Sequence, residues 1–213
     1  MASIVLLQND PLVGEALRKF IASEAGLRVT AVAGSLAQAR TLLAQGGVDL
    51  LVADLRVGSE RLVELLRERR MLGVAGQPQV LVVAISPEDP HLMQALRQGA
   101  DGYYIHGSPT KALARVIRQV LAGESPMSAS IARRLQAHFK RAEPDRSGVE
   151  RNESAGLTNS ERKTLQRLSQ GYLLHEIAQE LQTSEHSVGL RSRSLYRKLQ
   201  LDLSASALLR HAA

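Results

Sequence analysis

Hydrophobic and polar positions alternate between two periods over the first part of the chain. Short apolar runs, typical of strands buried on both faces, occur at residues 3–8, 27–33, 48–54, 80–85 and 102–105. Between them, apolar residues recur at helical spacing and predict helices at 11–25, 36–45, 60–71, 89–98 and 109–121. Strands that alternate with helices predict an α/β domain, built on a five-stranded, doubly wound parallel sheet covered on both faces.

The pattern changes after this α/β segment, which we place at 1–122. Residues 123–156 predict a linker, because one amphipathic helix at about 128–140 is followed by a charged, polar stretch with little apolar content. Residues 157–213 have helical spacing throughout. They predict a second, all-α domain of four helices.

Local signals divide the all-α segment into its helices. Thr158 and Glu161 match a capping box at the start of the first helix. A second helix ends near Leu181, and Ser184 is suited to cap a third helix after a short turn. A short fourth helix is expected at 204–211. Two helices joined by such a turn, the second of them basic, are typical of a helix-turn-helix motif.

Composition narrows the class of protein. The chain has 213 residues, 44% of them hydrophobic, which is enough to bury a core, and it has no cysteine. Disulfides and thiolate metal sites are therefore excluded. No apolar run reaches the roughly 18 residues of a membrane span, and the first residues lack the basic and apolar regions of a signal peptide. We therefore expect a cytoplasmic protein.

The positive charge is concentrated toward the C-terminus. The formal net charge is +6. Residues 1–122 hold 13 Lys and Arg against 11 Asp and Glu, residues 123–150 hold 5 against 4, and residues 151–213 hold 9 against 6. The net charges are thus +2, +1 and +3, so the all-α segment is the most basic for its size. This distribution favours a polyanion as the partner of that segment.

The third helix of the all-α segment has two different faces. Val188, Leu195 and Leu199 form an apolar back with Ser192 beside them, and the opposite face is basic. Such a helix fits the major groove of DNA, where Arg reaches guanine edges or phosphates and Leu contacts a thymine methyl. An ordinary amphipathic surface helix is the alternative, but pattern, cap and charge agree on DNA binding. The candidate DNA-binding residues are Thr183, Ser184, His186, Ser187, Leu190, Arg191, Arg193, Arg197 and Lys198.

The all-α segment resembles the LuxR-type DNA-binding domain. The resemblance rests on Leu157-Thr158-x-x-Glu161, Gln170-Gly171, Glu176-Ile177-Ala178, Ser184-x-x-Ser187-Val188 and Arg197-Lys198-Leu199. It implies that the third helix enters the major groove and that the fourth supports dimerisation, with Leu208 and Leu209 as its apolar edge. Gly189 stands where the family commonly has Lys, at a cost in helix propensity of ~1 kcal/mol. Base recognition is therefore expected to depend mainly on Leu190 and Arg193.

The α/β segment resembles the receiver domain of two-component response regulators in the NarL/FixJ arrangement. The matching stretches are Asp10-Pro11-Leu12-Val13, Val48-Asp49-Leu50-Leu51-Val52-Ala53-Asp54-Leu55 and Gly99-Ala100-Asp101-Gly102-Tyr103. The resemblance implies a flavodoxin-like strand order, with the site at the carboxyl ends of the strands. A phosphoryl group would then be accepted at that edge of the sheet.

This chain departs from the receiver pattern at the positions that carry the chemistry. The family has an acid pair after the first strand, and here Gln8 and Asn9 stand in its place. The acceptor is present as Asp54, but the Thr or Ser position holds Ala84 and the Lys position holds His106. Phosphoryl transfer relies on metal charge and cations to neutralise the transferring group. The sequence therefore predicts a degenerate receiver with neither metal nor cofactor.

Several arrangements are open for Asp54 in a receiver site that lacks the other functional groups. Asp10 lies one residue beyond the lost acid pair, but one step along the chain re-aims a side chain, so we discount it as a metal ligand. Arg56 or His106 is placed to neutralise Asp54. The alternative is a hydrated carboxylate, hydrogen-bonded to nearby amides.

These observations and the two resemblances predict a bacterial transcription regulator, without enzymatic activity, whose receiver works without phosphorylation. A conventional regulator phosphorylated on Asp54 and an adaptor that binds only proteins are the alternatives, and an enzyme using Asp54 as nucleophile is remote. We expect a homodimer on double-stranded promoter DNA. The last helix of the α/β segment supports this, because it is more apolar than one buried stripe requires, with Leu113, Val116, Ile117, Val120 and Leu121. The sequence identifies no effector ligand or regulatory protein.

Overall fold

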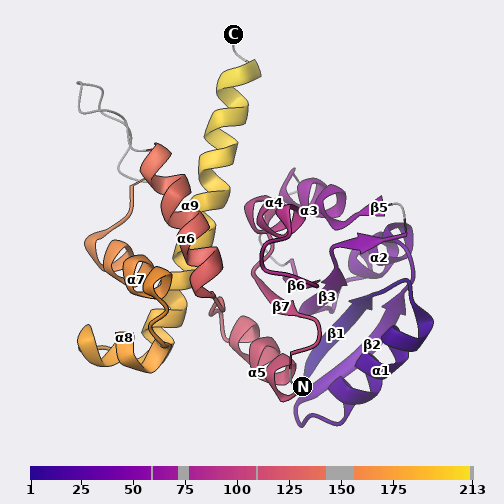
Figure 1. Cartoon of the computed structure of the whole chain (residues 1–213). Helices are drawn as coiled ribbons and strands as arrows, with labels where there is room; N and C mark the ends of the chain where they lie inside the picture. The colour runs from indigo at the N-terminus through magenta and orange to yellow at the C-terminus, as the bar shows by residue number, and fades with distance from the viewer. Residues whose placement is uncertain (59, 72–76, 109, 143–155, 212–213) are drawn as a thin grey trace. The chain divides into compact units, whose positions relative to one another are not determined.

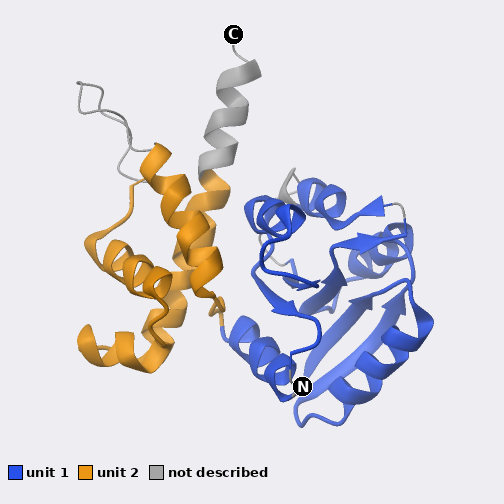
Figure 2. Cartoon of the chain, in the orientation of Figure 1, with its two compact units in different colours: residues 1–122 blue, residues 123–213 orange. Residues whose placement is uncertain are grey.

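The computed structural model describes residues 1–58, 60–71, 77–108, 110–142 and 156–211, with the backbone alone described at 70, 71, 110, 142 and 202–211. The chain divides into two compact units, residues 1–122 and 123–213 (Figure 2). In the described part of the chain, no helix is long and apolar enough to cross a membrane.

The first unit is a parallel sheet covered by helices on both faces, as the periodicity predicts (Figure 1). The strand order is β2-β1-β3-β6-β7, and every neighbouring pair is parallel. The strands are β1 (Ala2–Leu7), β2 (Leu27–Ala33), β3 (Leu50–Asp54), β6 (Gln79–Ala84) and β7 (Gly102–Ile105). The helices are α1 (Pro11–Ala22), α2 (Leu36–Ala44), α3 (Leu62–Met71), α4 (Pro90–Gln98) and α5 (Thr110–Leu121).

A short hairpin replaces the start of one predicted helix. Periodicity predicts a helix from residue 60, but β4 (Arg56–Val57) and β5 (Glu60–Arg61) pair antiparallel there. Gly58 has a φ of 63°, which suits a tight turn at that point. The helix α3 therefore begins only at Leu62.

The core of the first unit explains the apolar surplus of α5. Leu113, Val116, Ile117 and Val120 are all buried, in one cluster with alternate residues of the central strands. Leu121 is partly buried against the same cluster. The inference of a dimer surface from the apolar content of α5 was therefore wrong, because the sheet already covers these side chains.

The second unit is helical. Its helices are α6 (Ala129–Ala142), α7 (Asn159–Gln170), α8 (Leu174–Glu180) and α9 (Glu185–His211). α6 packs against α7, and α7 and α8 both pack against α9. The helix predicted within the linker therefore belongs to this unit, where Ile131, Leu135 and Phe139 are buried.

The predicted break between a third and a fourth helix is not present. α9 runs for 27 residues without interruption. The segment that was expected to separate the two helices, residues 200–203, contains neither Gly nor Pro, so nothing in its sequence forces the helix to end. The side chains of Leu208 and Leu209, predicted at a dimer interface, lie outside the described residues.

Candidate functional site

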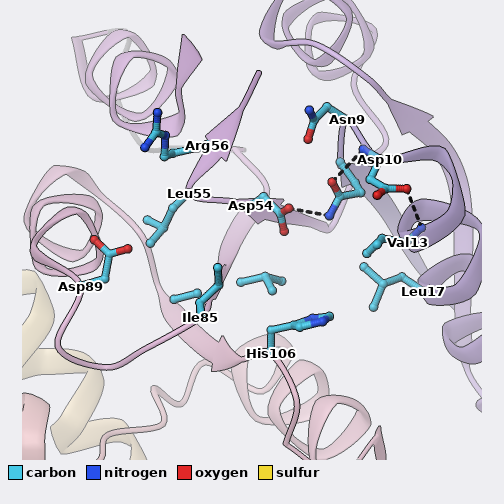
Figure 3. Close-up of a pocket in the computed structure, with 13 residues that line it drawn as sticks. Asn9, Asp10, Val13, Leu17, Asp54, Leu55, Arg56, Ile85, Asp89 and His106 are labelled. Carbon is cyan, nitrogen blue, oxygen red and sulfur yellow. Dashed lines mark hydrogen bonds between the residues drawn. The ribbon is translucent and has the colours of Figure 1, made fainter. Parts of the chain in front are cut away.

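The carboxyl ends of the central strands surround a pocket of about 350 Å³ in the first unit (Figure 3). Gln8 follows β1, Asp54 ends β3, Ala84 ends β6 and His106 follows β7. The lining is Gln8, Asn9, Asp10, Val13, Leu17, Asp54, Leu55, Arg56, Val83, Ala84, Ile85, Asp89 and His106. All six candidate residues of the degenerate receiver site therefore meet in one place.

A hydrogen bond between two side chains organises this pocket. Leu7 pairs with Ala53 across β1 and β3, so the next residue of each strand, Gln8 and Asp54, lies beside the other. The Gln8 Nε2–H donates to Asp54 Oδ2 at 2.5 Å, and Gln8 Oε1 accepts the Asp10 backbone N–H at 3.0 Å. Both ends of the amide are thus engaged, which fixes its donor end toward the carboxylate (Figure 3).

The environment of Asp54 favours its neutral form. Burial raises the pKa of the Asp54 carboxyl, and the hydrogen bond from Gln8 and the nearby His106 only partly oppose that rise. His106 itself is exposed.

Other carboxylates at the pocket rim serve as helix caps. Asp10 Oδ1 accepts the backbone N–H groups of Leu12 at 2.9 Å and Val13 at 3.3 Å, which caps α1. Asp89 Oδ1 caps α4 in the same way, through the His91 N–H at 2.8 Å. The discounted candidate Asp10 therefore already has a structural task.

The residues of this pocket do not fit a magnesium ion. Mg²⁺ is usually held by one or two carboxylates with octahedral geometry. Here an amide N–H donates to Asp54, and the carboxylate of Asp10 faces the start of α1. Among the residues that the structure describes, no group of three or more His, Cys, Asp or Glu is placed to hold a metal.

Arg56 does not neutralise Asp54 as one interpretation expects. Its side chain is exposed on β4 and points away from Asp54 (Figure 3). No ion pair joins the two within the described part of the chain. The alternative expectation was a carboxylate hydrogen-bonded to nearby amides, and Asp54 accepts such a bond from Gln8. The register of β1 and β3, which places Gln8 beside Asp54, would have identified this donor.

The second candidate site is the helix-turn-helix motif formed by α8 and α9. Ser184 caps α9, because its Oγ accepts the Ser187 N–H at 3.1 Å. The predicted apolar back is confirmed, since Val188, Ser192, Leu195 and Leu199 are fully buried. Tyr196 is buried with them.

The opposite face of α9 exposes some of the predicted DNA-binding side chains and leaves others half-buried. Leu190 is 42% exposed, and His186 and Arg197 are exposed as well. Arg191 and Arg193 are half-buried. Thr183, in the turn before α9, and Ser187, in the first turn of α9, are half-buried. Ser184, which precedes α9, is exposed. This face is available for groove contacts at Leu190 and Arg197.

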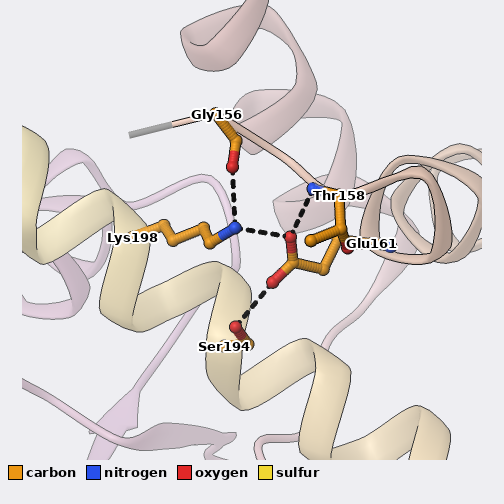
Figure 4. A network of polar contacts seen from close by, with 5 residues as sticks. All are labelled: Gly156, Thr158, Glu161, Ser194 and Lys198. Atoms are coloured by element: carbon orange, nitrogen blue, oxygen red, sulfur yellow. Dashed lines mark hydrogen bonds and ion pairs between the residues drawn. The ribbon is translucent and has the colours of Figure 1, made fainter. Parts of the chain in front are cut away.

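Lys198 belongs to a buried polar network rather than to this face (Figure 4). Its Nζ donates to Glu161 Oε2 at 2.7 Å and to the Gly156 carbonyl at 2.7 Å. Glu161 also accepts the Ser194 hydroxyl at 2.6 Å and the Thr158 N–H at 2.7 Å. The side chain of Lys198, predicted as a phosphate contact, is therefore engaged within the second unit, a contact with the capping-box glutamate that the helical wheel does not show.

The network controls the protonation of Glu161. Burial alone would raise the pKa of this carboxyl, but the hydrogen bonds from Lys198, Ser194 and Thr158 outweigh it and leave the pKa below its ordinary value. The capping box that the sequence predicts is thereby tied to α9. The glutamate is held as a carboxylate at neutral pH.

Comparisons with known proteins agree with this architecture. No protein-family model matches the chain. The nitrate/nitrite response regulator NarP of Escherichia coli K12 is 27% identical over 198 residues, which cover 93% of this chain and 88% of NarP. The DNA-binding transcriptional activator DevR/DosR of Mycobacterium tuberculosis H37Rv is 26% identical over 207 residues, covering 97% of this chain and 92% of DevR/DosR.

A solved structure supports the same relationship. The LuxR-family two-component response regulator from Aurantimonas sp. SI85-9A1 superposes with a TM-score of 0.57 and is 28% identical. The match covers 67% of this chain and 99% of that one. NarP and this structure are both response regulators, and DevR/DosR is a DNA-binding transcriptional activator.

Proposed function

The relatives of this chain are LuxR-family response regulators of the NarL type, and from that premise we propose that it is a sequence-specific transcription regulator whose receiver works without phosphorylation of Asp54. Its partner is double-stranded promoter DNA. It binds as a homodimer, because a lone helix-turn-helix makes few contacts and two-fold operators mirror dimeric proteins.

The second unit supports the DNA-binding part of the proposal. α9 has a fully buried back and a front that presents Leu190 and Arg197. The relative DevR/DosR is described as DNA-binding. Arg193 and Leu190 are the side chains from which we expect base recognition, through guanine edges and thymine methyl groups.

One observation carries the phosphorylation-independent part: Asp54 accepts a hydrogen bond from the Gln8 amide where a receiver needs a metal. A carboxylate takes up a phosphoryl group readily only if cations neutralise the charge on the oxygens of the transferring group. Here the neighbouring position holds an amide N–H, and Ala84 supplies no hydroxyl. The pocket retains the shape of an acceptor site without its charge balance.

Binding-site selection from random DNA tests this function. The full-length chain, untreated with any phosphodonor, is incubated with a random pool of duplexes, and bound duplexes are amplified and sequenced. We expect one enriched, two-fold symmetric motif. Failure to enrich any sequence, with the chain folded, would contradict DNA recognition and favour an adaptor that binds only proteins.

A further inference from the structure

The pocket at the carboxyl ends of the sheet has the size and the walls of a site for a small organic molecule. Its volume of about 350 Å³ lies within the range of roughly 300–1,000 Å³ that such sites occupy. Six of the lining side chains are apolar, and they are Val13, Leu17, Leu55, Val83, Ala84 and Ile85. These walls favour a ligand with an apolar body.

Part of the apolar wall is open to solvent. Ile85, the residue directly after β6, is 85% exposed although its side chain is large and hydrophobic. Leu17 of α1 is half-buried. In Figure 3, Ile85 and Leu17 lie on opposite sides of the pocket, with Asp54 above them and His106 below. A molecule seated between Ile85 and Leu17 would remove apolar surface of both from water, which the hydrophobic effect favours.

Asp54 presents a hydrogen-bond acceptor to this space. Its Oδ2 accepts the Gln8 amide, and Gln8 is itself held by the Asp10 N–H, so the orientation of the carboxylate is fixed. Its other oxygen, Oδ1, accepts no hydrogen bond from the residues that the structure describes. Because Asp54 lines the pocket, Oδ1 is the acceptor that a ligand would meet.

The charge around Asp54 favours a cation over an anion. Three carboxylates line the pocket, those of Asp10, Asp54 and Asp89, against the guanidinium of Arg56 and the imidazole of His106. Arg56 points away from Asp54 (Figure 3). Burial raises the pKa of the Asp54 carboxyl, as expected for a carboxylate with too little compensating charge. A positive group that enters the pocket would supply this compensation.

An organic cation fits these groups better than a metal ion does. Mg²⁺ requires several oxygen ligands in octahedral geometry, whereas an ammonium N–H requires one acceptor. Asp54 Oδ1 is such an acceptor, while Asp10 and Asp89 are engaged as helix caps. The apolar wall gives a metal no ligand, but it gives an organic molecule a surface to cover.

We propose that this pocket binds a small organic ammonium ion, whose N–H donates to Asp54 Oδ1 and whose apolar body lies between Leu17 and Ile85. The proposal rests on the phosphorylation-independent part of the proposed function, because a phosphoryl group on Asp54 would occupy the same space. The bound molecule supplies the cation that Asp54 lacks. Gln8 is a positioning residue, since it holds the carboxylate that binds the ammonium group.

Titration of the full-length chain with small amines, without Mg²⁺, tests the proposal. The probes are ethylamine, butylamine and benzylamine, which share the ammonium group and differ in apolar size, and the amide resonances of residues 8–10, 54–56 and 84–85 are followed by two-dimensional NMR. Benzylamine is expected to saturate these shifts with a Kd below about 1 mM, and ethylamine to bind at least about fivefold more weakly. Benzyl alcohol and benzoate keep the ring but lack the positive charge, so we expect them to bind at least about tenfold more weakly than benzylamine.

Substitutions separate the polar and apolar parts of the site. Asp54→Asn keeps the size of the side chain and removes its charge, and we expect it to weaken benzylamine binding about tenfold or more. Glu64→Gln is the matched control, because it removes the same charge from an exposed position of α3 that does not line the pocket, and it should change the affinity by less than about twofold. Ile85→Ser is expected to weaken benzylamine about three- to fivefold and to leave ethylamine within about twofold.

The outcomes distinguish this proposal from the function on which it rests. Failure of all three amines to saturate the shifts, or equal binding by Asp54→Asn and the unsubstituted chain, overturns the ligand proposal while the absence of phosphorylation stands. Equal affinity for benzylamine and benzyl alcohol also overturns it, because the carboxylate then plays no part. A Mg²⁺-dependent phosphoryl adduct on Asp54, measured by intact mass after incubation of a separate sample with acetyl phosphate, overturns the proposed function and the ligand proposal with it.

Discussion

Replacing Lys198 with methionine is expected to destabilise the second unit rather than to weaken DNA binding directly. Lys198 is 16% exposed and Glu161 is 6% exposed, and their charged groups lie 2.7 Å apart. Breaking a buried ion pair by removing one partner costs roughly 3–5 kcal/mol. Because Ser194 and Thr158 continue to donate to Glu161, we expect a cost at or just below the lower end of that range, about 2–3 kcal/mol.

Calorimetry of the full-length chain measures this cost. Lys198→Met is compared with Arg197→Met, which removes an exposed charge from the adjacent position of α9. The control is expected to change stability by less than about 0.5 kcal/mol. Combining Lys198→Met with Glu161→Gln should recover part of the loss, because no uncompensated charge then remains.

The pH dependence provides an independent check of the same network. The pKa of Glu161 is lower in the folded chain than its ordinary value of 4.5, so its stabilisation is present above that value. It is lost as the pH falls through the lowered, folded pKa. An unchanged melting temperature in Lys198→Met, combined with weaker binding to every DNA sequence, would refute this reasoning and return Lys198 to a phosphate contact.

Three further perturbations test other parts of the molecule. Arg193→Ala is expected to relax base preference at one position and to cost ~1–3 kcal/mol of binding, and repeating the selection with this variant would contradict the assignment if the motif stayed the same. Asp54→Asn is expected to raise the melting temperature at pH 7 more than at pH 4. Burial raises the pKa of Asp54, so its charged form is disfavoured in the folded chain. A lower melting temperature of the variant at pH 7 would show instead that the carboxylate is stabilising. Millimolar Mg²⁺ is expected to leave the melting temperature unchanged, since the pocket offers it no carboxylate pair, and a saturable rise that disappears in Asp54→Asn would contradict the interpretation of the pocket.

Most of the sheet could be predicted because its strands are buried on both faces. Runs such as Leu50–Asp54 are apolar up to their last residue, so their type follows from pattern alone, whereas the strand order was implied by the resemblance to receiver domains. The β4–β5 hairpin was missed because each of its strands has only two residues, too few for a period to be visible. The uninterrupted α9 was missed because a separate fourth helix was expected at 204–211, although residues 200–203 contain no Gly or Pro that would end the third.

The candidate sites, like the fold, could be predicted only in part from the sequence. Position along the strands predicts that Gln8, Asp54, Ala84 and His106 share one pocket, and the structure places them there. Which side chain pairs with Asp54 depends on local geometry, and register selects Gln8 over Arg56. Gly189 was visible in the sequence as a departure from the family, but its closeness to the side chain of Glu124, 65 positions earlier in the chain, was not.

Whether the receiver works without phosphorylation of Asp54 is decided by DNA affinity measured with and without a phosphodonor. The full-length chain and Asp54→Ala are each incubated with acetyl phosphate and Mg²⁺, and intact mass and affinity for the selected duplex are measured on the same samples. We expect no added phosphoryl mass, an unchanged affinity, and the same affinity in Asp54→Ala. A Mg²⁺-dependent phosphoryl adduct on the unsubstituted chain, with tighter DNA binding and neither effect in Asp54→Ala, would contradict it.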